Sequence, residues 1–243
     1  MNRLLYLIKG ELLRLHKYNV ISISVLVAFI WGIGLYFLDN EIFDAILPMI
    51  VLVDTTMMSV MYIGSVMFFE KKESTLSTIL VTPVKNTEII NSKIIANTIH
   101  NVFSTLLIVI VFIFIRSIEV NIFLILIAII LNTVLFTALG LYIAYFQKDF
   151  TTMLVTVMML MFLTLIPTVL YELNVLKSNL WEYILLINPV QAAQELVNGA
   201  FKINPIEWKY YFSLVYSIGL FVVSYLWLIV PKFKKYAVSA SGV

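Results

Sequence analysis

The chain has 243 residues, of which 62% are hydrophobic and 12% charged, and its mean hydropathy is +1.01. A soluble domain of this length would expose far too much apolar surface, so the composition excludes that class and predicts a membrane protein. The net charge of +2 gives no indication of nucleic-acid binding, and the absence of cysteine excludes disulfides, thiol catalysis and cysteine-ligated zinc.

Six apolar runs are each long enough to form a helix that crosses a bilayer: residues 19–38, 45–69, 94–115, 120–146, 151–171 and 209–230. About 20 residues at 1.5 Å each match the ~30 Å hydrocarbon core. Backbone groups in lipid need internal partners, and the runs lack the alternation of barrel strands, so they are predicted to be helices. We expect an all-α membrane protein that forms a single domain over residues 1–243.

The basic residues between these runs are distributed unevenly over alternate gaps. Twelve fall on one side: Arg3, Lys9, Arg14, Lys17, Lys71, Lys72, Lys85, Lys93, Lys148, Lys232, Lys234 and Lys235. Four fall on the other: Arg116, Lys177, Lys202 and Lys209. Because Lys and Arg accumulate in cytoplasmic loops, this pattern predicts a multi-pass protein of the cell membrane with both termini in the cytoplasm.

Residues 1–18 are expected to form an amphipathic helix. At helical spacing its apolar face is Leu4, Leu5, Ile8, Leu12 and Leu15, and its charged face is Arg3, Glu11, Arg14 and Lys17. Such a helix lies in the headgroup plane, with leucines in the acyl region and bases near anionic lipid. Two roles remain open for it, an anchor that orients the first span and a contact surface for a cytoplasmic partner.

Asp54 is the one acid well inside a predicted span. An ionisable group at that depth costs ~2.5–3.5 kcal/mol on insertion scales, so it normally faces protein or a water-filled cavity. A contact to a cationic substrate, a latch between two subunits, and a protonated or threonine-bonded side chain without a special task are all compatible with the sequence.

Residues 70–93 form the one sizeable loop on the basic side. Leu76, Ile79 and Leu80 recur at helical spacing, and Pro83 ends that helix because proline lacks a donor and restricts the residue before it. Asn86 and Thr87 are candidate N-caps of a following helix. The pattern predicts a helix–turn–helix protrusion.

In the next span, we expect His100 to lie near the headgroups with its hydrogen bonds satisfied.

Methionine and threonine concentrate in the second and fifth spans. The second holds Met49, Met57, Met58, Met61 and Met67, and the fifth holds Met153, Met158, Met159 and Met161 together with Thr152, Thr156, Thr164 and Thr168. Methionine suits surfaces that accept apolar ligands of different shapes. We therefore predict a translocation path lined by Asp54, Met57, Met58, Met61, Thr152, Thr156, Met158, Met161 and Thr164. The alternative is gap filling at helix–helix contacts.

The outer segment, residues 172–208, is too long for a simple connector. Asn188 and Pro189 interrupt an apolar stretch, and a short helix is expected from Val190 to Phe201. Pro167 is expected to kink the fifth span. These three residues, Pro167, Asn188 and Pro189, are the candidates for an outer gate, and a segment that rests on the membrane without gating is the alternative.

The loop at 70–93 resembles the first cytoplasmic loop of ABC-2-type exporter permeases, whose pattern is roughly E-x-E-x-G-T-L-x-x-L-L-x-T-P-x-x-x-x-E-x-x-x-G-K. Eight positions match it without gaps: Glu70, Thr75, Leu76, Leu80, Thr82, Pro83, Glu88 and Lys93. Ser74 and Ser92 replace the two glycines, and Lys72 replaces the second acid. Six spans, an amphipathic N-terminal helix and a long outer loop are also similar to that family, so the resemblance covers the whole chain.

The resemblance implies the type V exporter architecture. The loop would be a coupling helix that fits a separate ABC ATPase subunit, with Glu70, Glu73, Thr75, Leu76, Leu80, Thr82, Pro83, Glu88 and Lys93 as the coupling residues. A second permease subunit, identical or not, would complete the unit. Independently, the chain lacks a G-x-x-x-x-G-K-[ST] phosphate loop, so ATP and Mg²⁺ are expected on the partner, and this chain is not expected to be an enzyme or to hold a cofactor or metal.

The sequence thus favours a permease subunit that exports a hydrophobic or amphiphilic compound, such as a peptide, drug or lipid-like molecule. Two other classes remain. An ion-coupled secondary transporter or channel would use Asp54 as its proton site, although no inverted repeat is detectable. A membrane immunity or scaffold protein would transport nothing. The expected partners are the ATPase, the second permease subunit and the lipid bilayer, and no nucleic acid.

Overall fold

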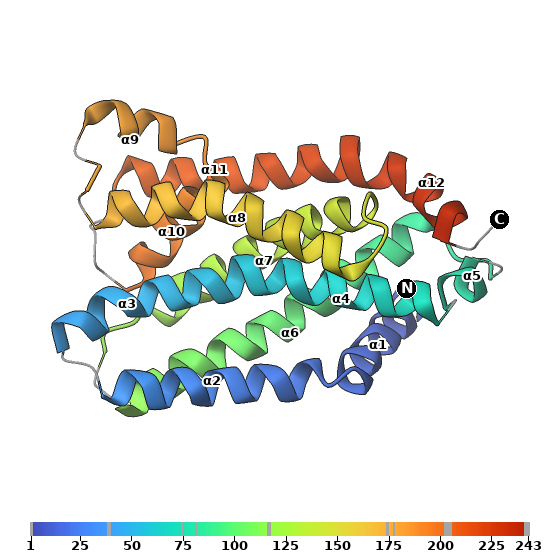
Figure 1. Cartoon of the computed structure of the whole chain (residues 1–243), viewed down its shortest axis with the longest axis horizontal. Helices are drawn as coiled ribbons and strands as arrows, with labels where there is room; N and C mark the ends of the chain where they lie inside the picture. Colours follow the sequence, from blue (N-terminus) through green and yellow to red (C-terminus); the bar gives the residue numbers. More distant parts are fainter. Residues whose placement is uncertain are drawn as a thin grey trace.

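The computed structural model describes residues 2–37, 40–73, 75–80, 82–115, 118–173, 175–176, 178–201 and 206–240. These residues form helices joined by short turns, and no strand occurs among them. The predicted all-α fold is therefore confirmed. The long helices run side by side along one axis (Figure 1).

The first half of the chain contains helices α1 to α5. α1 (Asn2–Lys17) meets α2 (Val20–Tyr36) at a bend of 59°. α3 (Asn40–Val53), a π-helical segment η1 (Asp54–Met58) and α4 (Ser59–Lys72) follow one another without a break. The short α5 (Thr75–Leu80) comes next. α1 therefore occupies the range of the predicted amphipathic helix, and α5 lies in the predicted protrusion.

The second half contains helices α6 to α12. α6 (Asn86–Ile115), α7 (Ile122–Ala144) and α8 (Phe150–Glu172) are the long ones. α9 (Asn179–Leu185) and α10 (Pro189–Ala200) lie in the outer segment, and α10 covers the predicted short helix. The last three helical segments are α11 (Trp208–Val223), η2 (Ser224–Ile229), which is π-helical, and α12 (Val230–Ala240).

Five helices among the described residues are long and apolar enough to cross a membrane, and the number rises to six if the bent α1–α2 pair is one span. The five cover Ile46–Lys72, Asn86–Ile115, Ile122–Ala144, Phe150–Glu172 and Trp208–Ala237. The difference from the six predicted runs arises at α2, whose 17 residues rise only about 25 Å along the helix axis. The helices of the third and sixth predicted runs, α6 and the α11–α12 segment, also extend beyond those runs, because polar turns continue the same helix.

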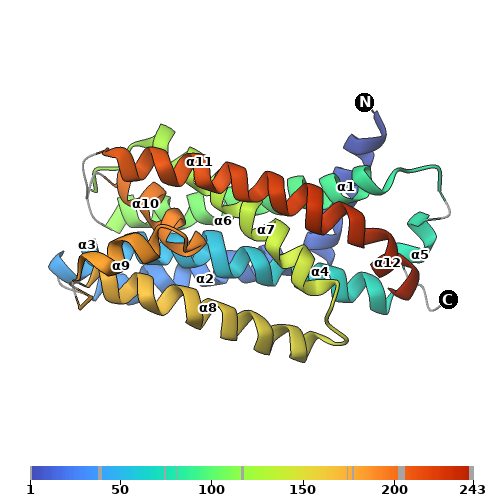
Figure 2. The same cartoon turned by 90° about the horizontal axis from the view of Figure 1, so that it is seen from above.

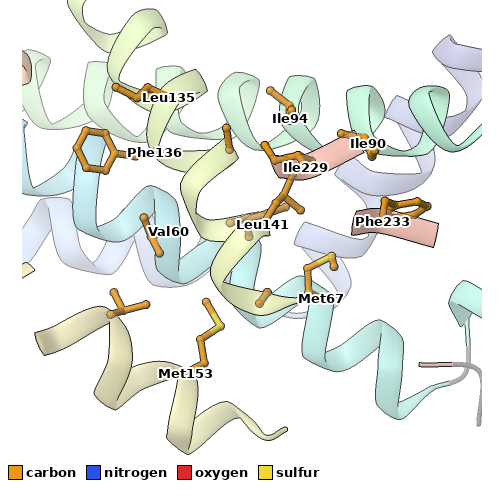
Figure 3. Packing of buried hydrophobic residues seen from close by; sticks show 14 of the residues in the cluster. Val60, Met67, Ile90, Ile94, Leu135, Phe136, Leu141, Met153, Ile229 and Phe233 are labelled. Carbon is orange, nitrogen blue, oxygen red and sulfur yellow. The ribbon is translucent and has the colours of Figure 1, made fainter. Parts of the chain in front are cut away.

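The helices assemble around several buried clusters. The largest brings α4, α6, α7, α8 and the last helical segments together, and Figure 3 shows Val60, Leu141, Met153 and Ile229 within it. Both termini and α5 lie at one end of the bundle, and α9 lies at the other (Figures 1 and 2). The first end, which carries the many Lys and Arg residues, is called the basic end below.

Candidate functional site

A buried cluster of charges joins three helices at the basic end. Lys93 on α6 donates to Glu70 on α4 and, at 3.0 Å, to Glu11 on α1. Arg14 on α1 also donates to Glu70 and, at 3.0 Å, to Glu11. Glu70 and Lys93 are each only 1% exposed. Two acids and two bases thus alternate around a closed ring, which fixes α1 against the ends of α4 and α6.

A second, exposed set of contacts continues this connection toward the protrusion. Lys17 and Tyr18, at the end of α1, donate to the carboxylate of Glu73 at 2.8 and 2.9 Å. The Tyr18 ring stacks on Phe69, with ring centroids 4.5 Å apart. Arg3, near the start of α1, donates to the carbonyl oxygen of Pro83 at 3.0 Å. α1 therefore contacts the chain on both sides of α5, at Glu73 before it and at Pro83 after it.

These exposed contacts shift two pKa values. Hydrogen bonds from Lys17 and Tyr18 lower the pKa of the Glu73 carboxyl, because they stabilise its ionised form. Burial, together with the hydrogen bond to Glu73, raises the pKa of Tyr18 to about 12. Both shifts widen the pH range in which Glu73 is charged and Tyr18 is protonated, which is the combination that the hydrogen bond requires.

Local sequence explains the shape of the protrusion. The chain turns after α5, where the Thr82 hydroxyl donates to the Ile79 carbonyl at 2.6 Å, and Pro83 follows. α6 then begins at Asn86 itself, whereas a helix capped by Asn86 would begin at the following residue. Glu88 accounts for the difference, because its carboxylate accepts the backbone N–H of Lys85 at 2.8 Å, as in a capping box.

The predicted coupling residues differ in how far they are exposed. Glu70 and Lys93 are buried in the ring of charges, so they can position the protrusion but offer no surface to another protein. Thr82, Pro83 and Glu73 are exposed. The remaining predicted residues are Thr75 and Glu88, which are half-buried, and Leu76 and Leu80, whose side chains lie outside the described residues.

Asp54 lies at the start of the π-helical segment and is 3% exposed. Its carboxylate accepts hydrogen bonds from Thr105 at 2.6 Å and from Ser104 at 3.4 Å, both on α6. A π-helical turn inserts an extra residue into a helix and so turns neighbouring side chains toward new partners. Asp54 is therefore directed at α6, and its hydrogen bond from Thr105 agrees with the threonine-bonded alternative, although no sequence pattern identified Thr105 as the partner.

The methionine and threonine residues of the predicted path do not share one surface within the chain. On α8, Met158 is 45% exposed, whereas Met161 is buried in the largest cluster with 7% exposed. Met57 and Met61 pack against that same cluster, and Met58 packs against a smaller one near α1. The hydroxyls of Thr152, Thr156 and Thr164 bond to carbonyl groups one turn earlier.

His100 lies buried among the helices of the bundle, and its predicted place near the headgroups stays a prediction. Because α6 begins at Asn86, His100 lies nearly four turns into the helix and is 3% exposed. Its ring nitrogen lies 3.1 Å from the Ser24 hydroxyl, which donates to Val20 O and lies 3.1 Å from the Tyr62 hydroxyl. The second part of the prediction, a hydrogen-bonded histidine, agrees with these contacts.

The candidates for the outer gate meet where α8 approaches α10. Asn188 donates to the Thr164 carbonyl at 2.7 Å and to the Thr168 hydroxyl at 3.1 Å. Its side-chain oxygen also accepts from Val190 N at 3.0 Å, so it caps α10, which begins at Pro189. Pro167 lies between the two threonines of α8. One asparagine therefore connects α10 to the proline-containing turn of α8.

Among the described residues, no group of three or more His, Asp or Glu side chains could hold a metal ion.

The model of the fluoroquinolones export permease protein family matches residues 2–241. The chain belongs to this family. Comparison with curated proteins gave no match.

Family membership and the helices together make the chain a multi-pass membrane protein of the export permease type. The match spans nearly the whole sequence, so the ring of charges, the protrusion and the outer segment all fall within it. Sequence reasoning selected Glu70 and Lys93 from the loop pattern but missed their partners on α1. The sequence feature that could have indicated these partners is the spacing of Glu11 and Arg14, which lie three residues apart and so on one face of that helix.

Proposed function

We propose that this permease is the membrane subunit of an ATP-driven ABC exporter of the ABC-2 type. The ring formed by Glu11, Arg14, Glu70 and Lys93 carries the argument, because it makes α1, α4 and α6 one rigid unit next to the protrusion. A push on α5 from another protein would therefore reach α4 and α6 directly. ATP and Mg²⁺ belong to a separate ATPase subunit in this proposal, and a second permease subunit completes the unit.

In this proposal the protrusion is a coupling helix at the cytoplasmic end. Thr82 and Pro83 are exposed and so are available to a partner, while Arg3, Lys17 and Tyr18 hold the segment from behind. The high density of Lys and Arg supports the assignment of this end to the cytoplasm of a cell membrane.

The cargo is proposed to be a hydrophobic or amphiphilic compound, and the family description favours a planar aromatic drug of the fluoroquinolone class. The exposed face of α8, with Met158, Met159 and Phe162, supplies an apolar and adaptable surface for such a molecule. A polar sugar would need hydrogen-bonding groups that this face does not offer.

Purification of the chain after mild detergent extraction tests the proposal. We expect an ATP-hydrolysing protein to remain bound, and Pro83→Leu to reduce this association while the chain itself stays folded. Uptake of a fluoroquinolone into inside-out vesicles should require ATP. If the purified chain alone moved the drug against its gradient in nucleotide-free liposomes, the proposal would be wrong and an ion-coupled transporter would replace it.

A further inference from the structure

A groove of about 600 Å³ opens at the basic end between the end of α4 and the start of α8. Its walls carry three lysines and three phenylalanines, which are Lys71, Lys72, Lys148, Phe68, Phe69 and Phe150. The volume falls within the range of about 300–1,000 Å³ typical of sites for small molecules. None of its lining residues belongs to the ring of charges or to the exposed part of the protrusion.

The groove has a net positive charge, with three lysines against one acid. Within the described part of the chain, none of the ion pairs involves Lys71, Lys72 or Lys148. The single acid in the wall, Asp149, accepts the backbone N–H of Thr152 at 2.8 Å and so caps α8. Three amino groups therefore face one carboxylate that is already engaged, and the groove complements an anion.

The other half of the groove is apolar. Phe69 and Phe150 are 42% and 38% exposed, so their rings face outward from the bundle. The Phe68 and Phe150 rings meet edge to face, with centroids 6.0 Å apart, which joins the walls from α4 and α8. A ligand for this groove has an anionic head and an apolar tail.

The groove also lies where two candidate membrane spans end. Lys72 is the last residue of one candidate span and Phe150 the first residue of another. Lysines at the end of a span reach the headgroup layer, and aromatic rings just inside them meet the upper acyl chains. An anionic phospholipid presents a phosphate and acyl chains in the same order along the membrane normal.

We propose that this groove binds the phosphate headgroup of an anionic phospholipid of the adjacent leaflet. The phosphate contacts Lys71 and Lys72 on one side and Lys148 on the other, so the lipid ties the end of α4 to the start of α8. The inference rests on the proposed membrane orientation of the basic end. It requires neither ATP nor the ATPase.

The absence of cysteine allows a site-specific test. Ser65 also lines the groove, so Ser65→Cys accepts one fluorophore there in the full chain reconstituted in phosphatidylcholine nanodiscs without nucleotide. Nitroxide-labelled phosphatidylglycerol should quench this fluorophore. Unlabelled phosphatidylglycerol should reverse the quenching at a concentration about tenfold or more below that needed with added phosphatidylcholine. Each lysine near an anionic lipid raises the affinity roughly fivefold.

Three triple variants separate the groove from general electrostatics. Replacing Lys71, Lys72 and Lys148 by Gln should abolish the preference, and replacing them by Arg should retain it. The matched control replaces Lys9, Lys85 and Lys235 by Gln, which removes the same charge from exposed positions of the same end and should leave the preference intact. Equal loss in both Gln triples, or no loss in the first, overturns the proposal.

Two competitors decide the source of the anion. Glycerol 3-phosphate carries the charge without the tail and should not reverse the quenching at matched concentration. A fluoroquinolone should displace the lipid less well than phosphatidylglycerol does. If either soluble compound competed better than the lipid, the groove would be a site for that compound and the lipid assignment would be wrong. Failure of ATPase binding would leave this assay unchanged.

Discussion

Glu70 at the end of α4 and Lys93 in the second turn of α6 form an ion pair that is closed off from solvent. The residues are 23 positions apart, and the whole protrusion lies between them. The pair therefore closes the base of the protrusion, and Glu11 and Arg14 complete its charge balance from α1. Removing Glu70 leaves two bases against one acid in the ring, and removing Lys93 leaves two acids against one base, so either change unbalances the buried charge.

We expect Glu70→Gln to destabilise the protein by about 3–5 kcal/mol, the usual cost of breaking a buried ion pair from one side. Thermal unfolding in detergent, followed by circular dichroism, measures this. Lys93→Met should behave alike, and the double variant Glu70→Gln/Lys93→Met should lose less than the sum of the two. Strict additivity would contradict a direct interaction between the residues.

The exposed pair of Lys17 and Glu73 is the matched control. It also joins α1 to the protrusion, but both side chains remain in contact with water. Solvent screens such pairs, so Glu73→Gln should change the unfolding temperature little. A loss as large as that of Glu70→Gln would mean that the whole interface, and not the buried ring, holds α1 in place.

The pH dependence of this exposed contact follows from the shifted pKa values. The folded state lowers the pKa of Glu73, so the contact contributes stability above the ordinary carboxyl pKa of about 4.3 and loses it as the pH falls through the lower folded value. The folded state raises the pKa of Tyr18 to about 12, so its contribution is present below pH 10 and is lost between pH 10 and 12.

Unfolding midpoints measured across pH, compared between wild type and each variant, test these two limits. The difference between wild type and Glu73→Gln should shrink on the acid side. The difference between wild type and Tyr18→Phe should shrink on the alkaline side. A difference that stayed constant from neutral pH to pH 12 would show that the Tyr18 hydroxyl does not contribute.

Hydropathy was sufficient to predict the long helices, because an apolar run in lipid must pair its backbone groups internally. The orientation that the charge pattern indicates stays a prediction. Neither hydropathy nor charge predicted which side chains meet across helices. The π-helical turn at Asp54 changes which face of the helix meets α6, and no local residue pattern encodes it. The contacts of His100 were also not predicted, because its partners Ser24 and Tyr62 come from two other helices, α2 and α4.

Gly140 on α7 allows the closest approach to α4. A Cβ atom there would lie 2.6 Å from the Ile63 side chain and 3.1 Å from the backbone Cα of Val60. Backbone cannot move aside as a side-chain end can, so Gly140→Ala should cost about 1–3 kcal/mol. Gly219→Ala is the control, because no atom lies within 4 Å of the added group. The alanine there should be neutral or slightly stabilising, and equal thermal shifts in the two variants would contradict this packing.

Asp54→Asn separates a structural acid from one that contacts cargo. The amide keeps the shape and one acceptor, so the Thr105 hydroxyl retains a partner, and we expect the unfolding temperature to stay near that of the wild type. Asp54→Leu should lower it, because Thr105 and Ser104 both lose their acceptor. We also expect transport of a cationic compound to survive in Asp54→Asn. Its loss with unchanged stability would instead make Asp54 a cargo contact.

Asn188 performs two tasks with one side chain. Its oxygen caps α10, and its amide binds α8 at Thr164 and Thr168. Asn188→Ala should therefore cost about 1–2 kcal/mol through the cap alone and also release the outer segment from α8. Asn188→Asp keeps the cap but removes both donors, so hydrogen exchange in α10 should remain slow while contact with α8 is lost. The release is measured by the accessibility of a single cysteine at Val190, which is buried in the wild type. If Val190→Cys were labelled at the same rate with Asn188 intact and in both Asn188 variants, Asn188 would not hold the outer segment.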